Sequence, residues 1–313
     1  MRMPLSRKRK LSYVREGDAS GRTLEIYQEI KETLGVPHLN ALFQAYGAYP
    51  RFLDLMWTSL RPALDTREFF AHSDRLRAEA YTAMHNYFAV PDLDSRIRQI
   101  QFSTGAQYEL AGVVDLFQYN DPLLLLIAAV QLQAFEDGPT HVRAAKNEAD
   151  HPIFTQKPVV LTEEAAPAPI RKIYDDIKRS LGINFLSLDF LAFARWPDFL
   201  SLYWNALKGV ISSPLYVEHK HALRESALAL SSGLPNAPQL SVDHMKHAGL
   251  SNEEISTAIH ITEEFLDLFS ASVLNVAFAK ISLEGGNQIR ATRNNIGSEQ
   301  IKVTREDHPE QAA

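Results

Sequence analysis

Residues 26–35 have the sequence IYQEIKETLG, and residues 173–182 have the sequence IYDDIKRSLG. Positions 26 and 173 differ by 147. The same shift, without a gap, aligns identical residues further along the chain, namely Phe43 with Phe190, Pro50 with Pro197 and Trp57 with Trp204. Chance does not keep one register over roughly fifty residues, so the chain contains an internal repeat.

Each copy has the spacing of α-helices. Ile26, Ile30 and Leu34 recur every three to four residues and are followed by Gly35, a residue typical of helix C-caps. Helical spacing continues over residues 52–64, 73–87, 103–119 and 122–135. Alternation of the kind that strands show is nearly absent. We therefore predict an all-α fold made of two tandem helical repeats related by a pseudo-twofold axis.

The pattern divides the 313 residues into five parts. They are a basic, flexible arm over residues 1–20, a first repeat over 21–135, a linker over 136–169, a second repeat over 170–285 and a polar tail over 286–313. The linker is long, rich in proline and has little periodicity, which is typical of a connection. Two similar helical units make their interface the natural place for a binding cleft.

Composition excludes several kinds of site. There is no cysteine, which excludes disulfides, thiolate metal sites and cysteine nucleophiles. No apolar run reaches the roughly 18 residues of a membrane span, and the longest, Leu123–Val130, is predicted to be a buried helix segment. The basic start, MRMPLSRKRK, is interpreted as a solvated arm rather than a targeting tag or nucleic-acid contact. With a net charge of −6, we expect a cytoplasmic protein with no membrane or nucleic-acid partner.

The two copies differ at one position where an apolar residue is replaced by a charge. Leu42 of the first copy corresponds to Asp189 of the second, which lies among Phe185, Ala192 and Phe193. Burial raises the pKa of a carboxyl group, and such a group is a candidate general base. The alternative is a structural role, either as a helix N-cap or in a hydrogen bond to the linker. The pattern alone leaves both open.

A second polar pair, Asn120 and Asp121, comes directly before Pro122 and the apolar run. Asp followed by proline and a helical segment is typical of an N-cap with proline at the first helical position. The pair could instead face a cleft. The histidines have no spacing typical of a metal site, and we expect no metal.

Two motifs stand out: Asp189-Phe190-x-Ala192-x-Ala194-x-Trp196-Pro197 and Phe117-x-Tyr119-x-x-Pro122-x-x-Leu125-Leu126-Ile127. Together with the two-unit layout over residues 22–285, they resemble the group I (DehI-type) 2-haloacid dehalogenases. The resemblance implies an all-helical, duplicated, homodimeric enzyme without a cofactor. It also implies that an Asp activates a water molecule, which attacks the halogen-bearing carbon of a 2-haloalkanoic acid directly, without a covalent ester.

By this resemblance Asp189 is the general base, and the backbone of Ser187 and Leu188 lies where the family holds the substrate carboxylate. The family has an Asn directly before the motif proline, which helps to hold the attacking water. This chain has Asp121 there, and Asn120 lies one residue earlier. The resemblance therefore makes both residues candidates for positioning that water.

The resemblance also points to a first-copy contribution to substrate binding. His38 and Ala41 lie where the family places pocket aromatics, and Thr66 matches a family Thr. Phe70 stands where some members have a Glu, and Leu188 replaces a Ser. The expected pocket is therefore altered relative to the family.

The exchange of Asn for Asp121 leaves three outcomes open. Two carboxylates about 5 Å apart at an effective dielectric constant of about 20 repel by about 3 kcal/mol, and an anionic haloacid would add a third negative charge. Either Asp121 is protonated and acts like Asn, or Asn120 holds the water, or the substrate is not a haloacid. The leading hypothesis is a haloacid dehalogenase. The alternatives are an enzyme with a neutral substrate, on which the two acids act as base and acid, and a non-catalytic ligand-binding protein.

Overall fold

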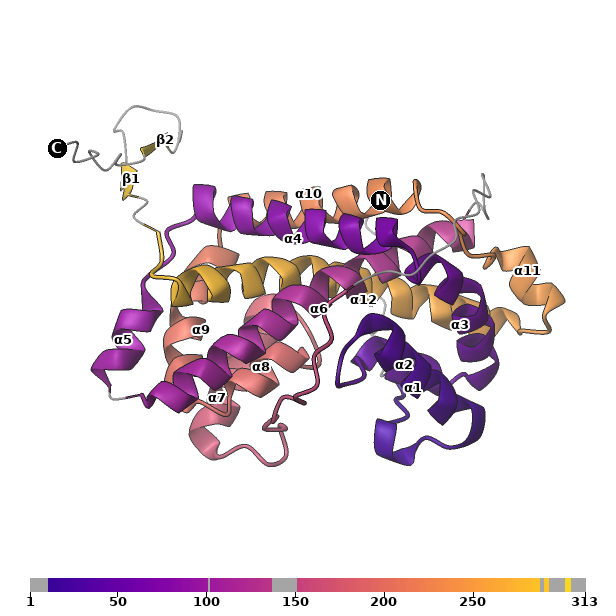
Figure 1. Ribbon diagram of the computed structural model, residues 1–313, viewed down its shortest axis with the longest axis horizontal. Helices are drawn as coiled ribbons and strands as arrows, with labels where there is room; N and C mark the ends of the chain where they lie inside the picture. The colour runs from indigo at the N-terminus through magenta and orange to yellow at the C-terminus, as the bar shows by residue number, and fades with distance from the viewer. Residues whose placement is uncertain (1–10, 101, 137–150, 288–289, 293–301, 305–313) are drawn as a thin grey trace, which may run out of the picture. The chain divides into compact units, whose positions relative to one another are not determined.

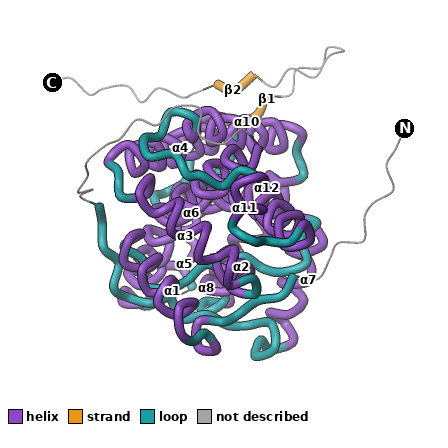
Figure 2. Tube along the Cα trace, turned by 90° about the vertical axis from the view of Figure 1, so that its right-hand side faces the viewer, coloured by secondary structure: helices purple, strands orange, loops and turns teal. Residues whose placement is uncertain are grey.

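The computed structural model describes residues 11–100, 102–136, 151–287, 290–292 and 302–304 (Figure 1). Helices dominate these ranges (Figure 2), so the predicted all-α class is confirmed. The helices are α1 (Gly21–Leu34), α2 (Ala41–Gly47), α3 (Pro50–Leu64), α4 (Arg67–Tyr87), α5 (Leu93–Gln99), α6 (Thr104–Glu136), α7 (Ala168–Leu181), α8 (Leu188–Phe193), α9 (Pro197–Ile211), α10 (Pro214–Ser231), α11 (Val242–His247) and α12 (Asn252–Leu283). A 3-10 turn, η1 (Glu16–Asp18), precedes α1, and β1 (Arg290–Thr292) pairs antiparallel with β2 (Lys302–Thr304).

The bounds of the helices recur along the chain with the shift found in the sequence. α1 begins at Gly21 and α7 begins at Ala168, which is 147 residues later, and the same shift relates α3 to α9. Both α1 and α7 end at a glycine in the left-handed conformation, Gly35 with φ 64° and Gly182 with φ 67°. Only glycine adopts this conformation without strain, so the same residue ends both helices. The pseudo-twofold axis and the linker remain predictions, and residues 137–150 lie outside the described residues.

Equivalent hydrogen bonds join α1 to α3 in the first copy of the repeat and α7 to α9 in the second. Trp57 of α3 donates from Nε1 to Glu29 of α1 over 2.8 Å, and Trp204 of α9 donates to Asp176 of α7 over 2.8 Å. Both indole rings are buried, so their N–H groups require an acceptor. The carboxylate one helix away supplies that acceptor in each case.

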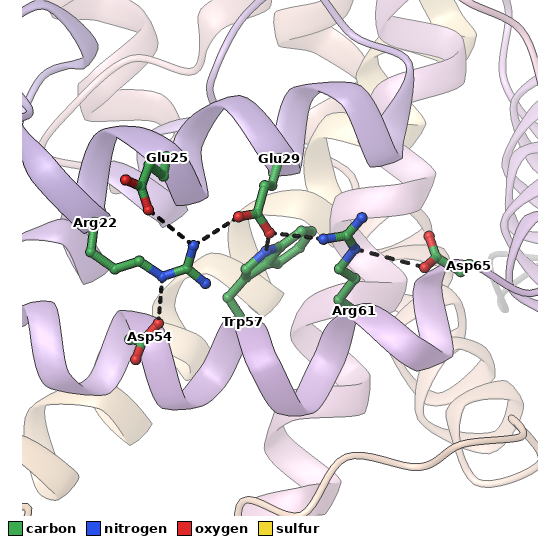
Figure 3. Close-up of polar contacts among 7 residues, drawn as sticks. All are labelled: Arg22, Glu25, Glu29, Asp54, Trp57, Arg61 and Asp65. Atoms are coloured by element: carbon green, nitrogen blue, oxygen red, sulfur yellow. Dashed lines mark hydrogen bonds and ion pairs between the residues drawn. The ribbon is translucent and has the colours of Figure 1, made fainter.

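Ion pairs extend this contact along the surface of α1 and α3 (Figure 3). Arg22 of α1 pairs with Glu29 on its own helix and with Asp54 on α3, each over 2.8 Å. Arg61 of α3 pairs with Glu29 over 2.9 Å. Because the two arginines are about half exposed, we expect each pair to contribute at most about 1 kcal/mol, chiefly to the register of the two helices.

The chain forms two compact units that are not continuous in sequence. Unit 1 consists of Met1–Phe69, Ile127–Thr155 and Ser231–Leu266, and unit 2 consists of Phe70–Leu126, Gln156–Leu230 and Asp267–Ala313. Boundaries fall inside α6 and α12, and close to one end of α4 and of α10, so each of these helices contributes residues to both units. The compact units are therefore not the predicted sequence repeats, because each repeat contributes to both units.

α6 and α12 are long and apolar enough, by length and composition, to cross a membrane. Their most apolar windows are, however, 89% and 72% buried within the protein. A helix that is apolar all round and covered by other parts of its own protein is a core helix. The predicted buried segment Leu123–Val130 lies in α6, and each of its residues is buried.

Part of the predicted arm over residues 1–20 contacts the first helices. Val14 donates its N–H to the carbonyl of Gln44 and accepts a hydrogen bond from the hydroxyl of Tyr27. Lys31 of α1 pairs with Glu16 of η1. These contacts attach residues 14–16 to α1 and α2, and the first ten residues lie outside the described part of the chain.

The polar tail predicted from residue 286 is also attached at its start. Asn287 donates from Nδ2 to the carbonyls of His85 and Phe88, over 2.7 and 2.9 Å, and its side chain and N–H both bond to Val90. Gly286 precedes it with φ 71°, and a Cβ atom there would lie 2.5 Å from the carbonyl oxygen of Val90. The turn after α12 is therefore built around a glycine and an asparagine.

Candidate active site

α8 is a helix of six residues in unit 2, and it places Asp189 in the protein interior. Its N-cap is Ser187, which has an extended backbone with φ −67° and ψ 156°. Asp189 is the second helical residue and is 1% exposed, and its neighbour Phe190 is fully buried. The alternative in which Asp189 caps the helix is therefore wrong.

The carboxylate of Asp189 is bound at one oxygen. Oδ1 accepts a hydrogen bond from the hydroxyl of Ser187, whereas Oδ2 is buried and has no hydrogen-bond partner among the residues that the structure describes. Burial raises the pKa of Asp189 to about 6, and hydrogen bonds from Ser187 and from the backbone of Phe190 act in the opposite direction. A carboxylate with a pKa near neutrality and an unbound oxygen can accept a proton from a substrate or a water molecule.

Asn120 and Asp121 lie in the middle of α6, which continues through Pro122. The predicted N-cap at Asp121 is therefore wrong. Proline inside a helix has no N–H for the carbonyl four residues earlier, here that of Gln118, and so weakens the helix at this point. The buried surroundings of the apolar run nevertheless keep both sides of Pro122 in one helix, because tertiary packing outweighs the local signal for a helix start.

The side chains of Asn120 and Asp121 are both buried in unit 2, and Nδ2 of Asn120 donates to Oδ1 of Asp121 over 3.2 Å. Burial, and then the negative charge of Asp189, raise the pKa of Asp121 well above its ordinary value, while the hydrogen bond from Asn120 lowers it. Two buried carboxyl groups that interact in this way favour a state with a single negative charge. The structure thus brings Asp121 and Asp189 into one electrostatic site.

Three further polar residues of unit 2, which the sequence analysis did not single out, belong to this site. The hydroxyl of Tyr203 donates to the backbone carbonyl of Asn275 over 2.9 Å, and the hydroxyl of Tyr216 donates to Oδ1 of Asn275 over 2.8 Å. Burial and the charge of Asp189 raise the pKa of both tyrosines, so both phenols stay neutral. They are fixed, uncharged dipoles within electrostatic range of Asp189.

The comparison of the two copies contained a signal for these residues. At the shift of 147, Tyr203 corresponds to Met56, Tyr216 to Phe69 and Asn275 to Ala128. Each pair exchanges an apolar side chain for a polar one, as Leu42 and Asp189 do.

Aromatic rings enclose Tyr203. The centroids of four phenylalanine rings lie 5.3 to 6.1 Å from its own, and these rings are Phe190, Phe193, Phe199 and Phe278. All four are fully buried. Such surroundings exclude water, which strengthens every charge interaction in the site.

The remaining predicted residues fall into two groups. Leu188 is the first residue of α8 and lies beside Asp189 in sequence, whereas His38, Ala41 and Thr66 belong to unit 1. The hydroxyl of Thr66 donates to the carbonyl of Ala63 and accepts from an N–H of α4. Ser213 makes the same two contacts before α10, so the contacts of Thr66 are those of a helix start. A role of these four residues in substrate binding stays a prediction.

The sequence of this chain is similar to those of known proteins. A family profile described as "Halocarboxylic acid dehydrogenase DehI" matches residues 37–190, a range that includes Asp121 and Asp189. An (R)-2-haloacid dehalogenase of Pseudomonas putida is 31% identical over 262 residues, which is 82% of this chain and 87% of that protein. The chain belongs to the DehI family.

Solved structures of D-2-haloacid dehalogenases are also similar to this chain. The structure titled "The crystal structure of D-2-halacid dehalogenase mutant" superposes with a TM-score of 0.84 at 29% identity and covers 90% of this chain and 99% of that chain. The structure titled "The complex structure of D-2-haloacid dehalogenase mutant with D-2-CPA" superposes with a TM-score of 0.83 at 29% identity, over 88% and 97% of the two chains. The resemblance noted in the sequence to DehI-type dehalogenases is confirmed.

Proposed function

We propose that this DehI-family chain is a hydrolytic dehalogenase, which removes halide from a 2-haloalkanoic acid with water as the nucleophile. Its membership in a family whose named members are 2-haloacid dehalogenases supports the reaction class. The observation that supports the mechanism is Asp189, a buried carboxylate with one unbound oxygen and a pKa raised to about 6. No cofactor enters the proposed reaction.

The reaction needs one proton transfer and one displacement. Oδ2 of Asp189 takes a proton from a water molecule as the water oxygen forms a bond to C2 of the substrate. The carbon–halogen bond breaks on the opposite side, and the halide leaves with the bonding electron pair. The product is a 2-hydroxy acid of inverted configuration, and Asp189 then releases its proton to solvent. General base catalysis of this kind contributes on the order of 10²- to 10⁴-fold to the rate.

Asp121 takes part in its protonated, neutral form. The raised pKa of Asp121 supports a pair whose single negative charge lies on Asp189, which the reaction requires as the base. A neutral carboxyl group has one hydroxyl donor and one carbonyl acceptor, as an amide has a donor and an acceptor. Asp121, fixed by Asn120, can therefore hold the attacking water in place of the family Asn. It also limits the charge that an anionic substrate meets.

The substrate carboxylate binds, in this proposal, to the backbone at Ser187 and Leu188. We further propose a preference for the (R)-enantiomer. Relatives named (R)-2-haloacid dehalogenase are 31% and 25% identical to this chain, whereas two relatives named 2-haloacid dehalogenase, configuration-inverting, are 22% identical.

The proposed homodimer rests on the family resemblance, and the proposed cytoplasmic location rests on composition. Size-exclusion chromatography with light scattering tests the homodimer.

Halide release from (R)- and (S)-2-chloropropionate by the purified chain tests the function. The expected result is chloride release from the (R)-enantiomer with (S)-lactate as product, and loss of release in Asp189→Asn. Reaction in H₂¹⁸O under single-turnover conditions should place ¹⁸O in the lactate from the first turnover. Failure to release chloride from either enantiomer, at enzyme concentrations equal to the substrate, would exclude the proposed reaction.

A further inference from the structure

Ser187 differs from its counterpart in the other copy in what its side chain does. Asn40 precedes α2 as Ser187 precedes α8, and both residues have an extended backbone. Oδ1 of Asn40 accepts the N–H of Leu42 over 2.9 Å, which is an ordinary N-cap. The hydroxyl of Ser187 makes no such cap bond and donates to Oδ1 of Asp189 instead.

As a result, the two carboxylate oxygens of Asp189 differ in their hydrogen bonding. Oδ1 is occupied by the Ser187 hydroxyl, and Oδ2 is buried with no hydrogen-bond partner among the described residues. A buried carboxylate oxygen without a donor is unfavourable for folding unless it serves another purpose. Because the Ser187 hydroxyl occupies Oδ1, Oδ2 is the oxygen of the carboxylate that is available to accept a proton.

We propose that Ser187 is a positioning residue for Asp189: its hydroxyl binds Oδ1, fixes the rotation of the carboxylate and leaves Oδ2 as the oxygen that accepts the proton from water. This inference rests on the proposed role of Asp189 as the general base. It assigns the Ser187 side chain a task that is separate from the backbone contact to the substrate.

The hydrogen bond also affects the charge state of the base. The titratable groups of the site on other helices are Asp121 on α6, Tyr203 on α9 and Tyr216 on α10, and the charge of Asp267 on α12 acts on Tyr216. Asp121 and both tyrosines have raised pKa values, and carboxyl and phenol groups carry no positive charge in either protonation state, so none of them supplies a positive charge to stabilise that of Asp189. Among side chains, the hydrogen bond of Ser187 opposes the effect of burial on the pKa of Asp189.

The test compares Ser187→Ala, Ser187→Thr and the matched cap variant Asn40→Ala. A hydrogen bond to a charged group contributes about one pKa unit or more, so Ser187→Ala should move the acidic limb of the kcat–pH profile about one unit upward. At pH 6, near the wild-type pKa of about 6, kcat should fall by about fivefold, with KM for (R)-2-chloropropionate changed by less than about twofold, because only proton transfer is affected. Ser187→Thr keeps the hydroxyl and should restore the wild-type profile. Asn40→Ala should lower Tm and leave the profile unchanged.

A second measurement separates this inference from the proposed function. The Asp189 carboxyl carbon is titrated by ¹³C NMR in wild type and Ser187→Ala, with its signal assigned by its absence in Asp189→Asn. An upward shift of the titration midpoint in Ser187→Ala supports the role of Ser187, whether or not the chain releases halide. A chain that shows this shift but releases no halide would overturn only the proposed function. An unchanged midpoint together with an unchanged pH profile would overturn the role of Ser187 while halide release persists.

Discussion

Leu42 of α2 and Asp189 of α8 occupy the same position in two helices whose counterparts recur after 147 residues, and both side chains are buried. α2 shows that a helix of this kind packs with an apolar residue at this position. The carboxylate of Asp189 is therefore not required by the local packing of α8.

The first prediction concerns the side chain of Asp189. Asp189→Asn keeps the shape of the side chain and removes its basicity, so halide release should fall by about 100-fold or more. Asp189→Leu should fold, because Leu42 is accepted at the matching position, and should be equally inactive. Circular dichroism and chloride release check both variants. Substantial activity in Asp189→Asn would show that another group takes the proton.

The second prediction concerns stability and pH. Because the pKa of Asp189 in the folded chain, about 6, lies above the ordinary value of 3.8, the folded chain keeps this proton between pH 4 and 6 after the unfolded chain has lost it. The free energy of unfolding should therefore fall by about 3 kcal/mol as the pH rises through this window. Asp189→Asn removes this loss and should have a higher Tm than wild type at pH 7.5, but a similar Tm near pH 4. Thermal unfolding at the two pH values measures the difference.

A surface variant provides the control for that experiment. Asp115 lies on α6, is half exposed and pairs with Lys280 over 2.8 Å. Asp115→Asn should give no gain in Tm at pH 7.5. An equal gain in both variants would indicate a general effect of net charge rather than the burial of Asp189.

The third prediction concerns Asp121. Asp121→Asn supplies the amide that the family has at this position and should keep halide release within about tenfold of wild type, since the water still has a donor and an acceptor. It should also remove the alkaline limb of the pH–rate profile, which arises when Asp121 ionises and adds a second negative charge. Asp121→Leu should lose release by about 100-fold. Retention of the alkaline limb in Asp121→Asn would assign that limb to another group.

The fourth prediction concerns the turn after α12. Gly286→Ala would place Cβ 2.5 Å from the carbonyl oxygen of Val90, whereas Gly285→Ala, also at a positive φ, has no atom within 4 Å. Both variants carry backbone strain of about 1–2 kcal/mol, but Gly286→Ala should lower the free energy of unfolding by at least about 1 kcal/mol more. Urea unfolding of the two variants measures this. An equal decrease in the free energy of unfolding of the two variants would mean that the segment near Val90 moves to make room for the Cβ atom.

The local features of the fold could be predicted from the sequence. The spacing of Ile26, Ile30 and Leu34 and the glycine that follows predicted the end of α1, because helix periodicity and the left-handed cap are local properties. Asp189 was found because a charge replaced an apolar residue in a duplicated pattern. Its burial is what that replacement predicted.

Features that depend on tertiary packing could not be predicted in this way. Asp121 before Pro122 has the local chemistry of an N-cap, yet the buried segment that follows continues the same helix. Tyr203 and Asn275 replace apolar residues of the other copy without a change of charge, so the comparison that found Asp189 passed over them. The repeat also gave no indication that the compact units would combine parts of both copies.

The composition of unit 1 has a consequence for synthesis on the ribosome. Its last part, Ser231–Leu266, follows more than two hundred residues of chain, so α1, α2 and α3 leave the ribosome long before unit 1 can be completed. Bringing such distant segments together makes folding slow relative to helical proteins with local contacts. A nascent chain stopped after the first repeat therefore exposes apolar surface, and we expect it to depend on chaperones until α12 has been made.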